Sequence, residues 1–359
     1  AGAGSGAHNR LLPRDIGFLI RAVLVTGAAG FIGAAVCERL LGRGERVVGI
    51  DNLNSYYDPA LKRARLARLE ALAPPGAWRF QQLDLGEVAA IAELFGREKP
   101  RLVIHLAAQA GVRYSIENPG AYLESNLVGL GSILEGCRHH GAEHLVYASS
   151  SSVYGGNTNL PFAESQPVNH PVSLYAATKK AGELMAHTYS HLYGLPATGL
   201  RFFTVYGPWG RPDMAPMLFA RAILAGESIR VFNQGRMRRD FTYIDDIVSG
   251  VIACADKPAT ADPGFDTSAP DPATSWAPHR LFNIGNSEPV ELLRFIELLE
   301  QALGREAIRD LQPMQPGDLE ATAADTSLLE AWVGFRPSTP IEVGVERFAH
   351  WYRHTYAKT

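Results

Sequence analysis

The stretch VLVTGAAGFIG, residues 23–33, decides the fold of this chain. A short apolar run leads directly into a turn with three glycines, and a helical pattern follows without a break. Glycines at these places permit a tight turn, close approach of backbone N–H groups to a pyrophosphate, and close packing of helix on strand. The helix N-terminus adds the positive end of its dipole. The stretch therefore predicts a dinucleotide-binding strand–turn–helix unit with contacts from Gly27, Gly30, Phe31, Ile32 and Gly33.

The first half of the chain alternates short apolar runs with longer helical patterns. The expected strands are Ala22–Thr26, Arg46–Asp51, Arg79–Asp84, Leu102–Ala107, His144–Ala148 and Ala197–Phe203. The expected helices are Phe31–Leu41, Leu61–Leu72, Val88–Lys99, Ala121–His140 and Leu174–Tyr193. The apolar runs lack polar alternation, as strands buried on both faces do. This pattern predicts an α/β fold of the Rossmann type, a doubly wound parallel sheet with helices on both faces.

The rhythm changes after residue 204, where Pro and Gly become frequent and helices are expected at Met217–Ala225 and Val290–Leu303. We expect an NAD-binding Rossmann domain over residues 20–203, with returning segments near 240–286. A smaller C-terminal α/β domain that binds substrate is expected over 204–359. Residues 257–280 offer few apolar side chains and are expected to form a surface loop. Residues 1–17 are expected to be a flexible leader.

Composition and charge exclude several classes of function. Hydrophobic residues make up 46% and charged residues 20%, the balance of a globular protein with a sizeable core. A net charge of −3 favours neither nucleic acid nor an anionic membrane as partner. Cys37, Cys137 and Cys254 form no CxxC pair, which predicts the reducing cytoplasm and no structural metal site. His187 and His191 share an expected helix face but lack a further ligand, so we expect no metal.

Residues at the ends of the expected strands indicate which dinucleotide is bound. Asp51 closes the second strand, where a carboxylate can accept both ribose hydroxyls and would repel a 2′-phosphate. Asp84 and Leu85 end the third strand, where an adenine would lie. Leu106, Ala107, Ala108 and Gln109 end the fourth strand and leave room for a cofactor to pass. The predicted cofactor is therefore NAD.

Tyr175 and Lys179 lie four residues apart on a helix that Ser173 caps, so both point from one face. A tyrosine has an ordinary pKa of about 10 and is a poor base near neutral pH. A neighbouring ammonium and a positive nicotinamide ring would both favour the phenolate. Such a tyrosine takes the proton of a sugar hydroxyl while hydride leaves the same carbon. Downstream of a dinucleotide turn, this pair predicts redox catalysis.

These motifs together resemble the extended short-chain dehydrogenase/reductase family that modifies nucleotide sugars. The resemblance rests on TGAAGFIG (26–33), SSSSVYG (149–155), the Tyr175/Lys179 pair, RFFTVYGP (201–208), RRDF (238–241) and MQPGD (314–318). Within the family, the pattern is most similar to the UDP-glucuronate 4-epimerases. DNLNSYYDPALKRARL (51–66), HLAAQAGVRYS (105–115) and GPWGRPDMA (207–215) carry that finer likeness.

The resemblance implies a set of contacting residues. For the cofactor it adds Asn52, Asn54, Asn126, Tyr175, Lys179, Phe202 and Val205. For the substrate it implies Arg113, Ser150, Ser151, Ser152, Tyr175, Thr204, Arg211, Pro216, Met217, Val231, Asn233, Gln234, Arg239, Gln315 and Asp318. In this reading Arg239 pairs with the diphosphate and Asp318 binds the uridine ribose. Val231, Asn233 and Gln234 would line the uracil pocket. Thr204 with Arg211, and Arg113 nearby, would receive a C6 carboxylate, which favours glucuronate over glucose.

The serine run separates the reaction types of this family. Ser150 matches the residue that completes the catalytic trio with tyrosine and lysine. Similar 4,6-dehydratases carry Asp-Glu at the next two positions, and decarboxylases carry Glu directly before the Val. This chain has Ser151 and Ser152, which perform no carboxylate acid/base chemistry. The sequence therefore predicts an NAD-dependent 4-epimerase that interconverts UDP-glucuronate and UDP-galacturonate through a 4-keto intermediate.

Three alternatives stay open at this point. The same fold serves a 4-epimerase of UDP-glucose or UDP-N-acetylglucosamine, and a UDP-glucuronate decarboxylase. A non-catalytic NAD-binding sensor is the third, although such proteins usually lose the Tyr or the Lys. The resemblance also implies a homodimer that pairs through helices corresponding to Ala121–His140 and Leu174–Tyr193.

Overall fold

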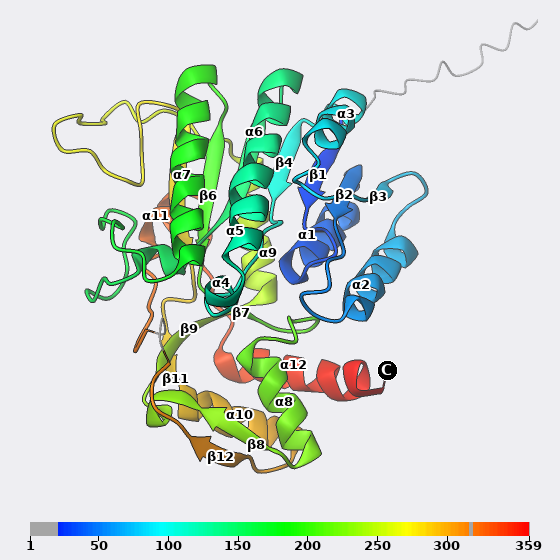
Figure 1. The fold of residues 1–359 in the computed structure, drawn as a ribbon, viewed down its shortest axis with the longest axis vertical. Coiled ribbons are helices and arrows are strands. Elements are labelled where there is room, and N and C mark those ends of the chain that lie inside the picture. Colours follow the sequence, from blue (N-terminus) through cyan, green and yellow to red (C-terminus); the bar gives the residue numbers. More distant parts are fainter. Residues whose placement is uncertain (1–20, 316–318, 359) are drawn as a thin grey trace, which may run out of the picture.

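The structure is a computed structural model that describes residues 21–315 and 319–358. Its centre is a parallel sheet in the order β10-β6-β5-β4-β1-β2-β3 (Figure 1). The strands are β1 (Val23–Thr26), β2 (Val47–Asp51), β3 (Trp78–Gln82), β4 (Leu102–His105), β5 (His144–Ser150), β6 (Ala197–Phe202) and β10 (His279–Ile284). The chain order reverses between β1 and β4. In such sheets this point opens a crevice at the carboxyl ends of the strands, where dinucleotides bind.

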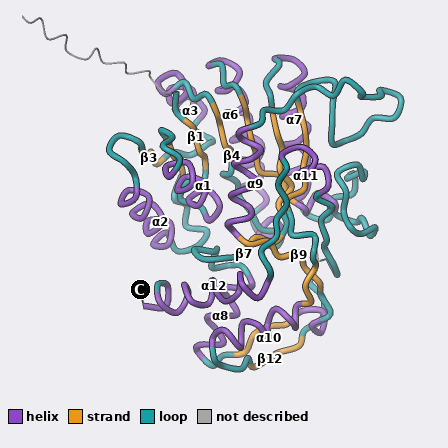
Figure 2. Tube along the Cα trace, turned by 180° about the vertical axis from the view of Figure 1, so that it is seen from behind, coloured by secondary structure: helices purple, strands orange, loops and turns teal. Residues whose placement is uncertain are grey.

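Helices cover both faces of this sheet. The helices concerned are α1 (Phe31–Gly42), α2 (Pro59–Leu72), α3 (Val88–Glu98), α6 (Gly129–His140), α7 (Leu174–Tyr193) and α9 (Ile244–Asp256). On one face α6 packs between α3 and α7, and on the other α1 packs against α9 and α2 (Figures 1 and 2). Alternate residues of β1 feed the two cores, with Val23 and Val25 on the α1 face and Leu24 on the α6 face. The sheet is therefore doubly wound, as predicted.

A smaller second part lies beyond the carboxyl ends of the strands. It holds β7 (Thr204–Tyr206), β9 (Arg238–Tyr243) and β11 (Pro289–Glu291) in one sheet, and β8 (Ser228–Val231) with β12 (Ile308–Leu311) in another. Its helices are α8 (Ala215–Ala225), α10 (Leu292–Leu303) and α12 (Ile341–His354), while α11 (Ser327–Val333) packs on β10. The short elements of the chain are α4 (Tyr114–Glu117), α5 (Pro119–Leu123), η1 (Glu124–Val128), η2 (Ser151–Tyr154), η3 (Phe232–Gly235) and η4 (Tyr356–Lys358).

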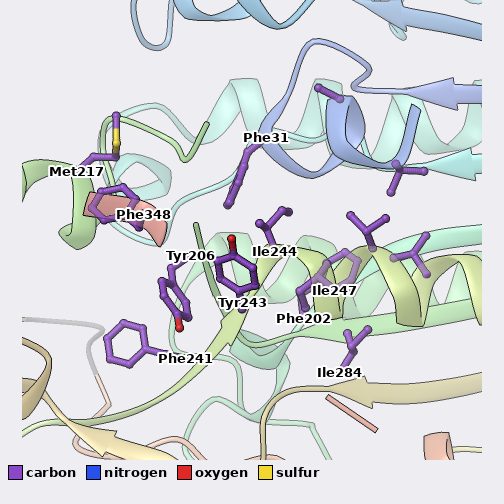
Figure 3. Packing of buried hydrophobic residues seen from close by; sticks show 14 of the residues in the cluster. Phe31, Phe202, Tyr206, Met217, Phe241, Tyr243, Ile244, Ile247, Ile284 and Phe348 are labelled. Atoms are coloured by element: carbon purple, nitrogen blue, oxygen red, sulfur yellow. The ribbon is translucent and has the colours of Figure 1, made fainter. Parts of the chain in front are cut away.

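One apolar cluster runs from the central sheet into the second part. Phe31 and Phe202 from the sheet side meet Met217 of α8 and Phe348 of α12 through this cluster (Figure 3). Tyr206, on the strand that connects the two parts, packs its ring against Phe241 and Tyr243. Because the two parts share this core, the crevice between them has a defined shape.

The six predicted strands are confirmed, with ends that differ by no more than a few residues. The predicted helix Ala121–His140 is interrupted by a π-helical turn, η1, between α5 and α6. The expected loop 257–280 is irregular up to residue 278, but its last two residues start β10. Polar composition conceals this strand, which adds to the edge of β6. The predicted leader, 1–17, lies outside the described residues. Across the described ranges no helix is both long and apolar enough to span a membrane.

Candidate active site

A cavity of about 1140 Å³ opens at the carboxyl ends of β1, β2, β4 and β5, between the sheet and the second part of the molecule. Its wall includes most of the predicted residues. At the dinucleotide end these are Gly27, Gly30, Phe31, Ile32, Gly33, Asp51, Asn52, Asn54, Asp84, Leu85, Leu106, Ala107, Ala108, Gln109, Phe202 and Val205. Toward the second part they are Arg113, Ser150, Ser151, Ser152, Tyr175, Lys179, Thr204, Arg211, Arg239 and Gln315.

The glycine-rich turn is built for close approach of a ligand to the backbone. Gly27 has a φ of 71°, which side chains other than glycine rarely adopt. A Cβ on Gly33 would lie 2.0 Å from the carbonyl oxygen of Gly27. Gly30 caps α1 without a side chain, so the first N–H groups of the helix stay available at the cavity wall. This arrangement suits a diphosphate.

Polar side chains meet at the ends of β2 and β3. Asp51 accepts a hydrogen bond from the backbone N–H of Leu53 at 2.9 Å. Asn52 donates to Asp84 at 2.7 Å, and Asn54 accepts from the ammonium of Lys62 at 2.9 Å. The Lys62 ammonium also lies 3.8 Å from the Asp51 carboxylate. Burial is the main cause that lowers the pKa of Lys62.

Asn126 supports the cavity from behind. It is 5% exposed and does not line the wall. Its side chain accepts a hydrogen bond from the backbone N–H of Gln109 at 2.9 Å and donates to the Gln109 carbonyl at 3.0 Å. It also donates to Thr178 on α7. Asn126 sits in the π-helical turn, a local irregularity that recurs at functional sites. It therefore fixes the strand end that the cofactor would pass.

The catalytic trio predicted from the sequence is assembled at the cavity wall. Ser173 caps α7 by accepting from the N–H of Ala176, and one helical turn separates Tyr175 from Lys179 on the same face. The Lys179 ammonium donates to the carbonyl of Ala148 at 2.9 Å. Ser150, at the end of β5, shares a hydrogen bond with the Tyr175 hydroxyl. Two elements thus deliver the trio to one place.

The electrostatics of Tyr175 differ in one respect from the expectation. Burial raises the pKa of Tyr175, and the hydrogen bond with Ser150 and the charge of Arg211 act in the opposite direction. The expected cation was Lys179, but its ammonium is turned to a backbone carbonyl, 6.0 Å from the centre of the tyrosine ring. Burial lowers the pKa of Lys179 to about 8. In this structure Arg211 is the cation that favours the phenolate.

Arg211, Asp213 and Tyr56 form a connected group at the cavity wall. Its guanidinium binds the Asp213 carboxylate through two hydrogen bonds, one of 3.0 Å from Nε. The hydroxyl of Tyr56 donates to the same carboxylate at 3.1 Å. Burial opposes the charge of Arg211, but the ion pair outweighs burial and raises its pKa. The predicted cation is therefore in place, with a carboxylate already bound to it.

Two further arginines on the wall are held by the second part of the molecule. Arg239 donates to the backbone carbonyl of Leu319 at 2.7 Å and to that of Glu320 at 3.2 Å. The guanidinium of Arg113 stacks over the ring of Phe232 at 4.8 Å. Both residues line the cavity.

Several predicted substrate residues lie away from the wall. Pro216 and Met217 start α8 and Val231 ends β8, and all are buried. Asn233 and Gln234 sit in a turn with left-handed backbone and do not line the cavity. Asp318 lies outside the described residues.

Sequence reasoning missed Lys62, Tyr56 and Asp213, which all line the cavity. Each lies inside a quoted motif, but a basic residue on a helix or an aspartate in a loop is usually solvated. The sequence offered one indication of their role: Tyr56 and Lys62 follow Asp51 closely along the chain, and Asp213 follows Arg211. His187 and His191 bind Ser275 and Trp276 of the 257–278 loop. No cluster of three potential metal ligands occurs in the ranges 21–315 and 319–358.

Comparison with known proteins places this geometry in a family. Residues 23–268 match the NAD dependent epimerase/dehydratase family. The probable UDP-glucuronate 4-epimerase of Rhizobium meliloti is 47% identical over 339 residues, which cover 93% of this chain and 98% of that protein. UDP-glucuronate 4-epimerase 4 of Arabidopsis thaliana is 48% identical over 340 residues, with 93% and 76% covered.

A solved structure shows the same fold. The UDP-glucuronic acid 4-epimerase from Bacillus cereus, in complex with UDP-glucuronic acid and NAD, superposes with a TM-score of 0.82 at 30% identity. The match covers 93% of this chain and all of that one (100%). With a match over more than half of its length and relatives near half identical, the chain belongs to the NAD dependent epimerase/dehydratase family.

Proposed function

We propose that the protein is an NAD-dependent nucleotide-sugar 4-epimerase, an isomerase that interconverts UDP-glucuronate and UDP-galacturonate. The observation that carries this proposal is the trio of Ser150, Tyr175 and Lys179 at a cavity whose neighbouring residues, Ser151 and Ser152, bear no carboxylate. A dehydratase or decarboxylase needs an acid/base carboxylate there. The relatives named above act on the acidic sugar, which supports glucuronate as the substrate.

The residues present fit NAD. A Cβ at Gly27 would collide with the backbone of Leu106 and Ala107, and one at Gly33 with the Gly27 carbonyl, so the tight turn that a diphosphate needs requires glycine at both positions. Asp51 stands at the end of β2 for the ribose. We infer that residues 20–203, with segments from 240–286, hold the cofactor and that 204–359 hold the sugar nucleotide. The place of β10 in the central sheet and of α9 against α1 supports this division. Bound NAD supplies the acceptor, and later the donor, of the hydride at C4.

The protein's own groups handle the proton. Tyr175 takes the proton of the C4 hydroxyl while a hydride leaves the same carbon, and the two losses together give a 4-keto sugar. After the sugar has turned over and the hydride has returned, Tyr175 gives the proton back. Ser150 hydrogen-bonds the same oxygen and orients it. Lys179 fixes the strand end through Ala148 and adds positive charge below a pH of about 8, because burial lowers its pKa to that value. Arg211 favours the phenolate from the sugar side.

We infer that Thr204 and Arg211, with Arg113 nearby, receive the C6 carboxylate and that Arg239 binds the diphosphate. A guanidinium fork suits both groups. Gln315 and Asp318 are proposed for the uridine, with Asn233, Gln234, Val231, Pro216 and Met217 shaping its surroundings. None of the last five lines the cavity in this structure, so their role would be to set the position of its wall.

The second candidate function is 4-epimerisation of a neutral sugar such as UDP-glucose. One observation favours it: Arg211 is already neutralised by Asp213, which leaves less positive charge for a sugar carboxylate. Competition between the two carboxylates for one guanidinium decides between the candidates.

The test incubates the purified protein with UDP-glucuronate and separates the products by chromatography with mass detection. A new peak of unchanged mass supports the proposal, and Tyr175→Phe is expected to lower its rate by roughly 10²–10⁴-fold. Conversion of UDP-glucose alone would favour the neutral-sugar epimerase. A product that has lost the mass of carbon dioxide would mean a decarboxylase, and NAD binding without any turnover would mean a sensor.

We further infer a homodimer and a cytoplasmic location. The α5–α6–α7 layer carries exposed apolar residues on α5, η1 and α7, with Leu123 45%, Val128 50%, Leu184 58% and Leu192 59% exposed. A second copy of this layer would cover them. If this is wrong, sedimentation analysis would show a single species with the mass of one chain and not of a dimer.

The three cysteines are buried and unpaired, which supports a reducing compartment.

A further inference from the structure

Arg65, on α2, is a buried cation with neutral partners. Arg65 is only 2% exposed. The guanidinium donates to the Trp209 carbonyl at 2.6 and 3.2 Å and to the Gly210 carbonyl at 3.2 Å. It also donates to the Ala29 carbonyl at 3.0 Å and to the Tyr57 hydroxyl at 2.8 Å. Arginines buried this deeply usually face a carboxylate. Here the hydrogen bonds instead tie separate backbone segments together.

The two segments that Arg65 joins belong to different parts of the active site. Ala29 lies inside the glycine-rich turn that would receive the dinucleotide. Trp209 and Gly210 lie in the 207–213 loop between β7 and α8, and Arg211 follows directly. One guanidinium therefore spans from the proposed cofactor site to the proposed sugar site. Only arginine has enough donors in a rigid fork to bind both segments at once.

Such a tie can hold the 207–213 loop, which turns sharply and holds Trp209 in a backbone conformation that is unfavourable for a residue with a side chain. Gly207 has a φ of 142°, and Trp209 has a φ of 64° although it is not glycine. That bend turns the carbonyls of residues 209 and 210 toward Arg65 and sends the next side chain, Arg211, into the cavity. The Trp209 ring itself packs 5.5 Å from Trp351 of α12.

We propose that Arg65 is a positioning residue that ties the 207–213 loop to the glycine-rich turn and so places the Arg211 guanidinium beside the reacting sugar. This inference rests on the proposed use of Arg211 for the substrate carboxylate. Arg65 does not line the main cavity, so it acts through the loop and not by contact with substrate. The sugar preference of the enzyme would then depend on a side chain that never meets the sugar.

The first experiment measures hydrogen exchange of the backbone amides of residues 207–213, without substrate. The variants are Arg65→Gln and, as a matched control, Arg63→Gln, which removes the same charge from the exposed side of the same helix. We expect exchange in the loop to rise at least about tenfold in Arg65→Gln and to stay unchanged in Arg63→Gln. Wild-type exchange in Arg65→Gln would overturn the proposal. If Arg65→Gln does not fold, Arg65→Lys replaces it, because lysine keeps the charge but cannot bind both segments.

The second experiment is a double-mutant cycle on sugar preference, defined as the ratio of kcat/KM for UDP-glucuronate to that for UDP-glucose. Arg65→Gln alone is expected to lower this ratio by about tenfold. In an Arg211→Gln background the same change should have almost no further effect, because Arg65 acts through Arg211. If the two substitutions together lower the ratio by the product of their separate effects, Arg65 does not act through Arg211 and the proposed coupling is refuted. A wild-type protein without preference for the acidic sugar would overturn the proposed function, while loop exchange would still decide whether Arg65 holds the loop.

Discussion

Replacing Glu183 by alanine is predicted to cost about 3 kcal/mol of stability. Glu183, on α7, is ion-paired with Arg201 of β6, and their side chains are 1% and 0% exposed. Two hydrogen bonds of 2.8 and 2.9 Å join them. Ser149, next to the catalytic serine, donates to the same carboxylate at 2.6 Å. The substitution would leave a buried guanidinium with only the Tyr154 hydroxyl as a hydrogen-bond partner.

Two estimates of the magnitude agree. Burial acts to raise the pKa of Glu183, but the charge and hydrogen bonds of Arg201 outweigh it and hold the pKa at about 2, below the ordinary 4.5. A carboxyl with a lowered folded pKa stabilises the protein above pH 4.5, and this stability is lost as the pH falls toward 2. The difference corresponds to about 3 kcal/mol. Breaking a buried ion pair costs roughly 3–5 kcal/mol, and 3 kcal/mol lowers the Tm of a chain this long by roughly 4 °C.

The assay is urea unfolding at pH 7 together with thermal unfolding between pH 7 and pH 3. Glu70→Ala, at an exposed site on α2, is the control and should change stability by less than about 0.5 kcal/mol. The double variant Glu183→Met/Arg201→Met should recover part of the loss, because no buried guanidinium is left unpaired; Lys180, which also pairs with Glu183, keeps access to water. A loss below about 1 kcal/mol, or a variant that loses stability with acid as steeply as the wild type, would refute the reasoning.

Three further predictions concern the active site. Gly33→Ala is expected to abolish NAD binding in an equilibrium titration, because its Cβ would lie 2.0 Å from the Gly27 carbonyl oxygen; normal affinity would show that the turn relaxes. Burial lowers the pKa of Lys179 to about 8, so its charge is present below that pH and lost above it. The kcat profile should therefore fall above about pH 8, and a profile flat to pH 9.5 would contradict this role. Asp213→Asn releases Arg211 from its carboxylate and should lower KM for UDP-glucuronate by roughly tenfold with little effect on UDP-glucose; an equal effect on both sugars would argue against competition.

Most of the central sheet could be predicted from the sequence, because its signals are local. Each strand is a short apolar run, and burial on both faces removes the need for polar alternation. β10 was missed as a strand because it follows a polar loop and pairs only with β6, far away along the chain. The π-helical turn was missed for a related reason. It is defined by backbone hydrogen bonds with a longer spacing than those of the α-helix, and the apolar periodicity of the sequence does not distinguish the two.

The site residues divide in the same way. Gly27, Tyr175 and Lys179 were identified because their spacing carries the geometry. Lys62 and Asp213 were not identified, because a charged residue is normally expected in contact with solvent. Only the tertiary structure shows that both line the cavity. The residues predicted for the uracil pocket came from the family resemblance, and the structure puts Val231 in the core.

The sequence by itself determined what backbone conformation and helix periodicity control. A turn with a φ of 71° at Gly27 requires glycine, and residues four apart on a helix share a face wherever the helix is placed. Only the tertiary structure decided which charges meet. The Asp213 carboxylate accepts a hydrogen bond from Tyr56, and Arg65 binds carbonyls instead of a carboxylate. These pairings depend on the relative positions of α2, the glycine-rich turn and the 207–213 loop, which the shared core holds together and which are separated by long stretches of chain.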